Sequence, residues 1–458
     1  MRNPKITVIG AGSESFGLTN LGAIMRTPQL AGSTLALCDK NEEGLKKIVT
    51  LARRISNEWG SDIKIESSVK SSDVIPGSDF VIISVAIDRE KCWLMDHELG
   101  KKYGIIHYAE NGGPGGFFHG ARNIALVHPI LKEIEKLAPN AFVLNFTNPM
   151  TRICTLASHY TKVEMVGICH QIDFGHIMIA RILAGDLGLD VNSNYLFRWG
   201  GNGEDDRKLI SAAEERVDVL AAGINHFTWF RSIRDKQTGE ELFPLFKKRF
   251  LEQTVFEPYT RDIIRLFDEC PVSGDAHLLE YLPYTSNPAR GGWERYDIQM
   301  FPLTGGDKTR NEMWDNISDM AAGKKDIEPL RHVQTERAES IIAAVWHGEN
   351  LYDMAVNIPN TQHVISNLPV DAVVEVPAVL GLHGVKGVSM GDLPPIAAEF
   401  CNRQKIIVDL AVKAAVEGDR VAAVQALALD PMVDDLSVAE RIVEEGLALN
   451  KAYLPAFS

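Results

Sequence analysis

Two predicted strand ends in this chain carry side chains that can bind a divalent cation. Cys169 ends the apolar run at 164–169, and His226 follows a second apolar run at 216–223. A thiolate sulfur and an imidazole nitrogen can hold one ion and leave positions open for substrate oxygens. Each residue alone also fits a structural role, and their wide separation is not a ligand-spacing signal. Because both follow strands expected to face one crevice, the pair is a candidate metal site.

Segment 273–283 carries the candidates for a catalytic base. It opens a predicted helix that Asp275 is placed to cap, and His277 and Tyr281 form an i, i+4 pair on one helix face. Side chains of these types can remove a proton from a bound substrate. The same residues also fit a capping and core role, so all three stay open as candidates for the base.

Three further polar residues are candidates for substrate binding. Asn111 lies in segment 110–117, whose run of glycines indicates close backbone approach to a ligand, with a flexible surface loop as the alternative. Arg122 can bind a carboxylate or a pair of hydroxyls, although a surface ion pair fits it equally well. Asn148, in the turn after a predicted strand at 141–146, can point its amide into the cleft, with a plain turn as the alternative.

The N-terminal segment predicts a dinucleotide-binding unit. A strand at 5–9 leads into a glycine turn and a helix at 16–27, and a second strand at 34–38 ends on an acid. This order places a pyrophosphate at a helix N-terminus, and an acid at the adenosine ribose favours NAD over NADP. Ser15 replaces the third glycine of the usual fingerprint. The predicted NAD-binding residues are Gly10, Gly12, Ser13, Asp39, Ala86 and Asn148.

Alternating strands and helices continue to about residue 189 and predict a parallel, doubly wound sheet. In such sheets, ligands bind beyond the carboxyl ends of the strands. Segments 86–88, 147–149 and 169–170 all fall at these ends, so we expect them to share one crevice.

The second half of the chain has a different pattern. Strands at 195–200 and 216–223 indicate a separate, antiparallel sheet, and long helices follow. We therefore expect an α/β chain with a dehydrogenase-like Rossmann NAD-binding domain at 1–194. An α+β domain at 195–458 would supply substrate and metal binding and oligomer contacts. The polar segment 287–325 is a candidate lid.

Composition and charge narrow the class of protein. The 458 residues include 45% hydrophobic and 24% charged side chains, which is ordinary for a globular protein. A net charge of −14 argues against nucleic acid or an anionic membrane as a partner. The sequence has no apolar run long enough to span a membrane and no signal-like start, so we expect a cytoplasmic protein.

These motifs together resemble glycoside hydrolase family 4, whose members are glycosidases that depend on NAD and a divalent metal and have a dehydrogenase-like fold. The turn at 145–149 is also similar to the asparagine turn of lactate and malate dehydrogenases. The motifs that carry the family resemblance are Gly10-x-Gly12-Ser13, Gly113-Pro114-Gly115-Gly116, Thr147-Asn148-Pro149, Gly167-x-Cys169-His170 and Asn225-His226, with Val373–Pro377 as a further segment.

The resemblance implies a mechanism for hydrolysis of α-glycosides without net redox change. NAD oxidises C3 of the sugar, the resulting ketone acidifies C2, and a base removes the C2 proton. The C1 substituent is then eliminated, water adds, and the ketone is reduced again. Cys169 and His226 would bind Mn²⁺, Asn148 would contact the sugar, and His170 would be the acid for the leaving group.

The resemblance also indicates a substrate class. Segments 223–229 and 274–280 are most similar to the α-galacturonidase members, and His170 is similar to the residue at this position in the α-galactosidase and α-uronidase members. A uronide substrate would need a cation such as Arg122 or Arg290 to meet its carboxylate. Family members commonly form homodimers or homotetramers, so we expect a homo-oligomer. The alternatives are an α-galactosidase or α-glucosidase of the same family, or a lactate/malate-type 2-hydroxyacid dehydrogenase. A non-enzymatic NAD-sensing protein is a further alternative.

Overall fold

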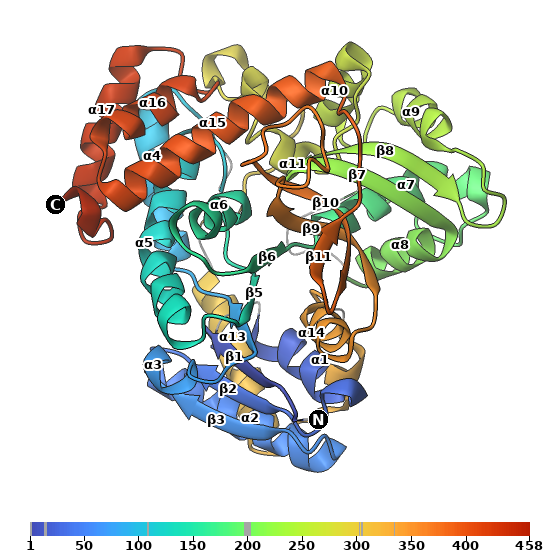
Figure 1. The fold of residues 1–458 in the computed structure, drawn as a ribbon. Coiled ribbons are helices and arrows are strands. Elements are labelled where there is room, and N and C mark those ends of the chain that lie inside the picture. Colours follow the sequence, from blue (N-terminus) through green and yellow to red (C-terminus); the bar gives the residue numbers. More distant parts are fainter. Residues whose placement is uncertain are drawn as a thin grey trace.

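The computed structural model describes residues 2–12, 16–107, 110–196, 203–301, 303, 306–333 and 335–458. Within these residues, one sheet crosses the molecule in the order β3-β2-β1-β4-β5-β6-β9-β10-β7-β8, and β11 pairs with β10 (Figure 1). The strands are β1 (Lys5–Ile9), β2 (Thr34–Cys38), β3 (Lys64–Ser68), β4 (Phe80–Ile83), β5 (Phe142–Asn145), β6 (Met165–Ile168), β7 (Val217–Ile224), β8 (Phe227–Asp235), β9 (Leu351–Pro359), β10 (Val373–Gly381) and β11 (Gly384–Gly387).

Helices cover both faces of this sheet. The short apolar strands β1, β4 and β5 are buried almost throughout, as expected for parallel strands between helical layers. The α-helices are α1 (Leu21–Arg26), α2 (Glu42–Trp59), α3 (Ser71–Val74), α4 (Arg89–Lys102), α5 (Gly113–Leu137), α6 (Met150–Tyr160), α7 (Gln171–Leu187), α8 (Gly203–Arg216), α9 (Phe243–Glu252), α10 (Pro258–Phe267), α11 (Gly274–Leu278), α12 (Gly292–Arg295), α13 (Gly306–Ala321), α14 (Ala338–His347), α15 (Pro395–Glu417), α16 (Arg420–Leu429) and α17 (Leu436–Leu449).

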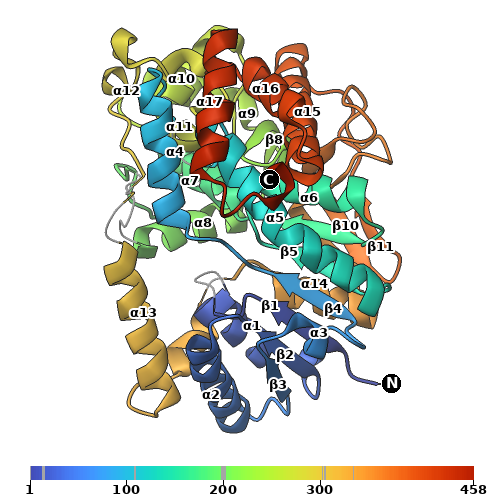
Figure 2. The same cartoon turned by 90° about the vertical axis from the view of Figure 1, so that its left-hand side faces the viewer.

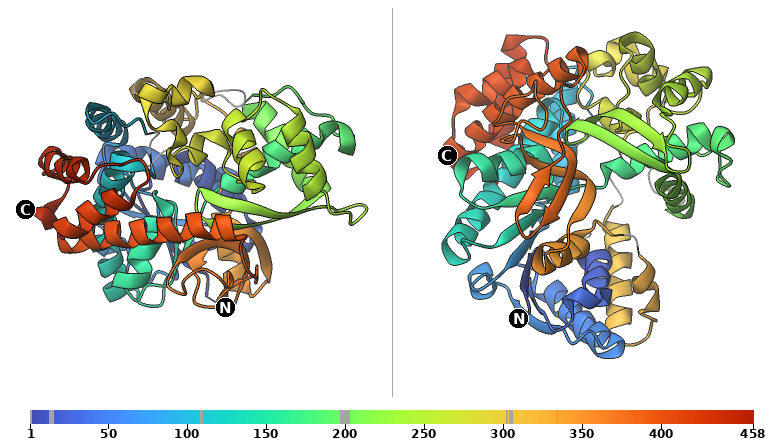
Figure 3. Two further views of the ribbon diagram at one scale, coloured as in Figure 1. Left: turned by 90° about the horizontal axis from the view of Figure 1, so that it is seen from above. Right: turned by 45° about the vertical axis from the view of Figure 1, so that its right-hand side comes forward.

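The N-terminal strands pair in parallel, which confirms the predicted Rossmann-like sheet. The antiparallel strands do not form a separate sheet, contrary to the prediction. Instead, β6 pairs with β9 in antiparallel register, Gly167 opposite Asn357, and the sheet continues into β10, β7 and β8. Figure 3 (right) shows β9 and β10, in orange, between the N-terminal half and the green hairpin of β7 and β8. The strand predicted at 195–200 lies largely outside the described residues.

Later segments return to the N-terminal half across the predicted boundary at 194/195. Helix α13 packs against α2, and α14 packs against α1 and the β9–β10 pair. Figure 2 shows α13 beside α2, away from the C-terminal helices α15 to α17, which pack on α4, α5 and α6. The predicted lid at 287–325 therefore contributes a helix to the wall of the dinucleotide half. No helix in the described part of the chain is both long and apolar enough to cross a bilayer.

Candidate active site

The glycine turn after β1 has the geometry expected of a phosphate-binding turn. Gly10 has a φ of +90°, and a Cβ at this position would lie 2.0 Å from the carbonyl oxygen of Ser84. Asp39, just beyond β2, accepts a hydrogen bond from the Gly12 amide at 2.8 Å. Only glycine fits the first position, and the acid fixes the turn from the neighbouring strand. Ser13 lies outside the described residues.

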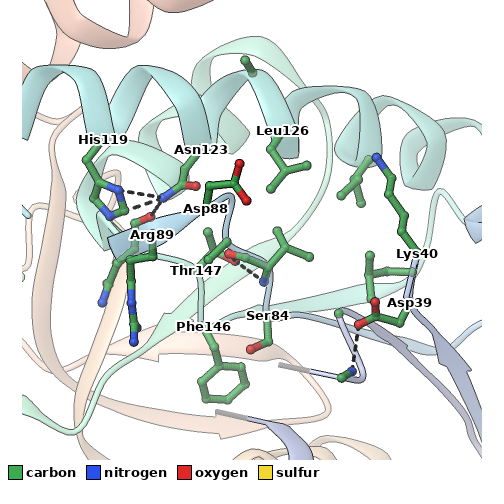
Figure 4. Close-up of a pocket in the computed structure, with 18 of the residues that line it drawn as sticks. Asp39, Lys40, Ser84, Asp88, Arg89, His119, Asn123, Leu126, Phe146 and Thr147 are labelled. Carbon is green, nitrogen blue, oxygen red and sulfur yellow. Dashed lines mark hydrogen bonds between the residues drawn. The ribbon is translucent and has the colours of Figure 1, made fainter. Parts of the chain in front are cut away.

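A cavity of about 1140 Å³ opens beyond the carboxyl ends of β1, β4 and β5 (Figure 4). This is the place where doubly wound sheets bind ligands. Trp314 of α13 lines the cavity and packs over the glycine turn, 3.4 Å from where a Cβ of Gly12 would lie. The cavity is lined by every described residue that the sequence assigned to NAD, namely Gly10, Gly12, Asp39, Ala86 and Asn148.

Asn148 presents a free acceptor to this cavity. Its Oδ1 atom is buried and has no hydrogen-bond partner within the described part of the chain. Its backbone carbonyl accepts a hydrogen bond from Asn123 Nδ2 at 2.6 Å, which holds the turn against α5. Buried polar atoms are normally paired, so this side chain has the geometry to bind a ligand hydroxyl.

Cys169 and His226 converge as the strand-end prediction required. Cys169 Sγ lies 3.3 Å from His226 Nε2, and both side chains are buried. A sulfur and a nitrogen bound to one zinc ion at ordinary bond lengths, with an S–Zn–N angle of about 100°, lie roughly 3.4 Å apart. The observed distance therefore fits a single divalent cation held by both residues. Burial holds the pKa of His226 well below its usual value, which keeps the imidazole in the neutral form that metals bind. Burial raises the pKa of the Cys169 thiol, so a cation is needed to keep it as thiolate.

A buried carboxylate positions the histidine. Asn225 and His226 form the two-residue turn between β7 and β8, and His226 has a φ of +61°, unusual for a residue other than glycine. Asn225 Nδ2 donates a hydrogen bond of 2.5 Å to Glu375 Oε2 on β10, and Asn357 Nδ2 donates another at 2.9 Å. The sequence analysis missed the role of Glu375, although an acid inside the apolar run 373–377 was its signal.

A second group of polar side chains meets His226 from α11 and the segment before α5. The His277 ring lies 4.2 Å from the His226 ring, and His277 Nδ1 is 3.1 Å from Glu280 Oε2. Asn111 Nδ2 donates to Glu280 Oε2 at 2.9 Å and lies 3.4 Å from His226 Nδ1. Three residues named from sequence therefore come together, and Glu280, which the sequence analysis did not assign to the site, joins them.

The other two candidates for the base are held in structural contacts. Contrary to the prediction, Asp275 does not cap α11. It accepts hydrogen bonds from the backbone amides of Tyr259 and Thr260, at the start of α10. The Tyr281 hydroxyl donates to the Asn225 carbonyl at 2.9 Å, and its ring stacks on Phe227. The contacts of Asp275 join α11 to α10, and that of Tyr281 braces the His226 turn.

Neither predicted arginine lies in the cavity. The guanidinium of Arg122 is fully buried in a two-pronged ion pair with Asp96, so the predicted contact with a substrate carboxylate is wrong. Arg290 is exposed at the end of a 3₁₀ turn and does not line the cavity. Arg89, at the start of α4, is a cation in the cavity wall that the sequence analysis did not identify (Figure 4). His170 is 67% exposed, with Nδ1 3.6 Å from Glu336 Oε1.

The glycine-rich segment is a helix start, not the predicted loop. Helix α5 begins at Gly113, and its glycines are required by packing. A Cβ at Gly112 would lie 1.9 Å from the Glu280 carbonyl oxygen, and one at Gly115 would lie 2.3 Å from the His107 ring. The close approach predicted for a ligand is made by the protein itself, which brings Glu280 and His107 against the start of this helix.

Glu110 links the two groups of side chains. It lines the cavity, and its Oε2 atom is 3.8 Å from His226 Nδ1. Burial, reinforced by Glu280, raises the pKa of Glu110 from its ordinary 4.5 to about 7. In the metal-free protein, the folded chain therefore keeps a proton that the unfolded chain releases above about pH 4.5. The free energy of unfolding should fall by up to about 3 kcal/mol as pH rises from about 4.5 to 7.

Glu110→Gln is expected to remove this loss, so the variant gains stability over the parent chain as pH rises from 5 to 8. Urea denaturation of both metal-free proteins at several pH values measures the difference. Glu98→Gln, at an exposed position, is the matched control and should follow the parent chain. Parallel pH profiles for Glu110→Gln and the parent would contradict the assignment.

Comparison with known proteins identifies the family of this chain. The sequence model of the family 4 glycosyl hydrolases matches residues 5–187, and that of the family 4 glycosyl hydrolase C-terminal domain matches residues 221–433. The chain belongs to this family. The resemblance drawn from the motifs is thereby confirmed, and the protein is a glycosidase by family.

The relatives act on several sugars. An α-glucosidase from Erwinia rhapontici is 28% identical over 98% of this chain and 98% of its own length. An α-galacturonidase from Lachnoclostridium phytofermentans is 26% identical over 98% of this chain and 97% of its own. The structure of a 6-phospho-β-glucosidase from Thermotoga maritima with manganese, NAD⁺ and glucose-6-phosphate has a TM-score of 0.77 and 21% identity, covering 98% of this chain and 99% of that one. This last likeness shows that the fold is shared.

Proposed function

We propose that this family 4 glycosidase hydrolyses α-galacturonides or related α-uronides, with NAD and Mn²⁺ as catalytic cofactors. The observation that carries the proposal is the 3.3 Å approach of Cys169 Sγ to His226 Nε2. Glu110 joins this pair to the cavity beneath the glycine turn, so a sugar bound between them would reach both. When bound, NAD would accept and return the hydride at C3, and Mn²⁺ would supply Lewis acidity beside it.

We further propose roles for the polar residues of the site. Asn148 and Asn111 orient the sugar hydroxyls, since each presents a side-chain amide at the boundary of the two groups. His277 removes the C2 proton, and Glu280 holds its Nδ1 atom so that Nε2 acts as the base. His170, exposed beside Cys169, would protonate the leaving group, with Glu336 raising its pKa.

The substrate carboxylate needs a cation in the cavity wall. Arg89 replaces Arg122 and Arg290 in this role, because it lines the same cavity as Asn148. A guanidinium binds a planar carboxylate through two parallel hydrogen bonds, which would favour a uronide over the neutral sugar. The cytoplasmic location and the homodimer or homotetramer remain predictions from sequence and family resemblance.

One assay separates the candidate reactions. The protein is incubated with NAD⁺, Mn²⁺ and a thiol, and with aryl α-galacturonide, α-galactoside or α-glucoside in turn. Aryl release without NADH accumulation, fastest for the galacturonide and with solvent deuterium entering C2 in D₂O, supports the proposal. Preference for a neutral sugar would reassign the substrate within the family. Steady NADH formation from a 2-hydroxyacid, without aryl release, would support the dehydrogenase alternative instead.

A further inference from the structure

A second cluster of metal-binding side chains lies outside this site, between α7 and α8. Asp173 and His176 are one turn apart on α7, and Glu214 faces them from α8. One ligand atom from each of these residues lies within 4.8 Å of the others. Neither the glycosidase reaction nor NAD binding uses this α7–α8 cluster.

His176 is the observation that points to a ligand. Its side chain is 1% exposed, and neither ring nitrogen has a hydrogen-bond partner among the residues that the structure describes. Burial lowers the pKa of His176 to about 4, so the ring is neutral and has a lone pair to offer at pH 7. A buried histidine in an apolar layer usually donates or accepts at least one hydrogen bond, and two unpaired nitrogens are costly.

Both acidic and basic groups surround the imidazole of His176. Two carboxylates face the imidazole, and both are partly exposed, which leaves an entry path from solvent. The guanidinium of Arg337 also acts on both carboxylates, and it is paired with Asp353 at 2.8 Å. Lys236 also acts on His176 and Glu214, but its ammonium group donates to the Glu214 backbone carbonyl at 2.5 Å, so the carboxylate oxygens are not part of that hydrogen bond.

We propose that Asp173, His176 and Glu214 form a second divalent-cation site of the zinc class, with one nitrogen and two oxygen ligands. One imidazole and two carboxylates suit Zn²⁺ or Co²⁺ better than Mg²⁺ or Ca²⁺, which take oxygen ligands. The ion ties α8 to the beginning of α7, the helix that follows Cys169 and His170 directly. It therefore has a structural role, separate from the cation held by Cys169.

Zinc binding tests the site in a background that lacks the first one. The double variant Cys169→Ser/His226→Ala is titrated with Zn²⁺ by calorimetry, and we expect one ion per chain. Adding Glu214→Gln should weaken zinc binding at least tenfold. Loss of a residue that only supports a metal ligand lowers metal affinity about 10–100-fold, and loss of a ligand itself should cost no less. Adding Glu215→Gln instead, at the next, exposed position, should leave it unchanged. No zinc bound by the double variant, or equal affinity after Glu214→Gln, overturns the proposal.

Cobalt distinguishes this site from the proposed catalytic one. In the parent chain, Co²⁺ at Cys169 should give a sulfur-to-cobalt charge-transfer band, whereas Co²⁺ at the α7–α8 cluster should give only d–d bands. Glu214→Gln should remove the part of the d–d absorption that the cluster contributes and keep the charge-transfer band. A missing charge-transfer band would count against the catalytic metal alone, and a d–d spectrum unaffected by Glu214→Gln would count against the cluster alone.

Discussion

Cys169→Ser is expected to lower the rate of aryl α-galacturonide hydrolysis at least about 10³-fold. A Lewis-acid cation contributes several kcal/mol to stabilising charge at the reacting carbons, and each 1.36 kcal/mol is a factor of ten. Serine stays a neutral hydroxyl at pH 7 and is a poor substitute for a thiolate ligand. The rate of aryl release at saturating Mn²⁺ and NAD⁺ measures the loss, and calorimetry measures the accompanying fall in Mn²⁺ affinity.

Cys270→Ala is the matched control for this experiment. Cys270 is also a fully buried free thiol, but it packs in the apolar layer of α7, α9 and β8, not beside His226. This variant should keep Mn²⁺ affinity and turnover, even if it loses some stability. Full activity of Cys169→Ser after treatment with a chelator would refute the metal assignment, and with it the proposed chemistry.

The parts of the fold that local pattern determines could be predicted from the sequence. The carboxyl ends of β1, β2 and β6 were predicted correctly, just before Gly10, Asp39 and Cys169. A short apolar run bounded by turn residues is typical of a buried strand. The convergence of Cys169 with His226 followed from topology, because each residue comes shortly after a strand of what proved to be one sheet.

Contacts between distant segments could not be predicted in the same way. Glu375 supports Asn225 only because β10 lies beside β7, a neighbour relation that no local pattern encodes. The glycines of 112–116 were interpreted as a ligand loop, since the sequence does not show that Glu280 and His107 press against this backbone. The sequence around Arg122 likewise does not show whether its guanidinium binds a ligand or, as the structure has it, the buried carboxylate of Asp96.

Arg122→Ala is expected to destabilise the protein by about 3–5 kcal/mol, because it leaves a buried carboxylate without its partner. Arg122 Nη2 and Nη1 donate to the two oxygens of Asp96, at 2.5 and 3.0 Å, and both side chains are at most 1% exposed. Nη1 also donates to Asn450 Oδ1 at 2.7 Å, so the ion pair joins α4, α5 and the end of α17. Urea denaturation measures the change in the free energy of unfolding.

The double variant Asp96→Leu/Arg122→Met separates this structural role from substrate binding. Replacing both partners by apolar side chains of similar size removes the unpaired charge, so we expect most of the lost stability to return. The ratio of kcat/KM for galacturonide to that for galactoside should equal that of the parent chain, because the guanidinium faces Asp96 and not the cavity. A specific rise in KM for the galacturonide would show that Arg122 meets the carboxylate after all, and Arg89 would then lose its proposed role.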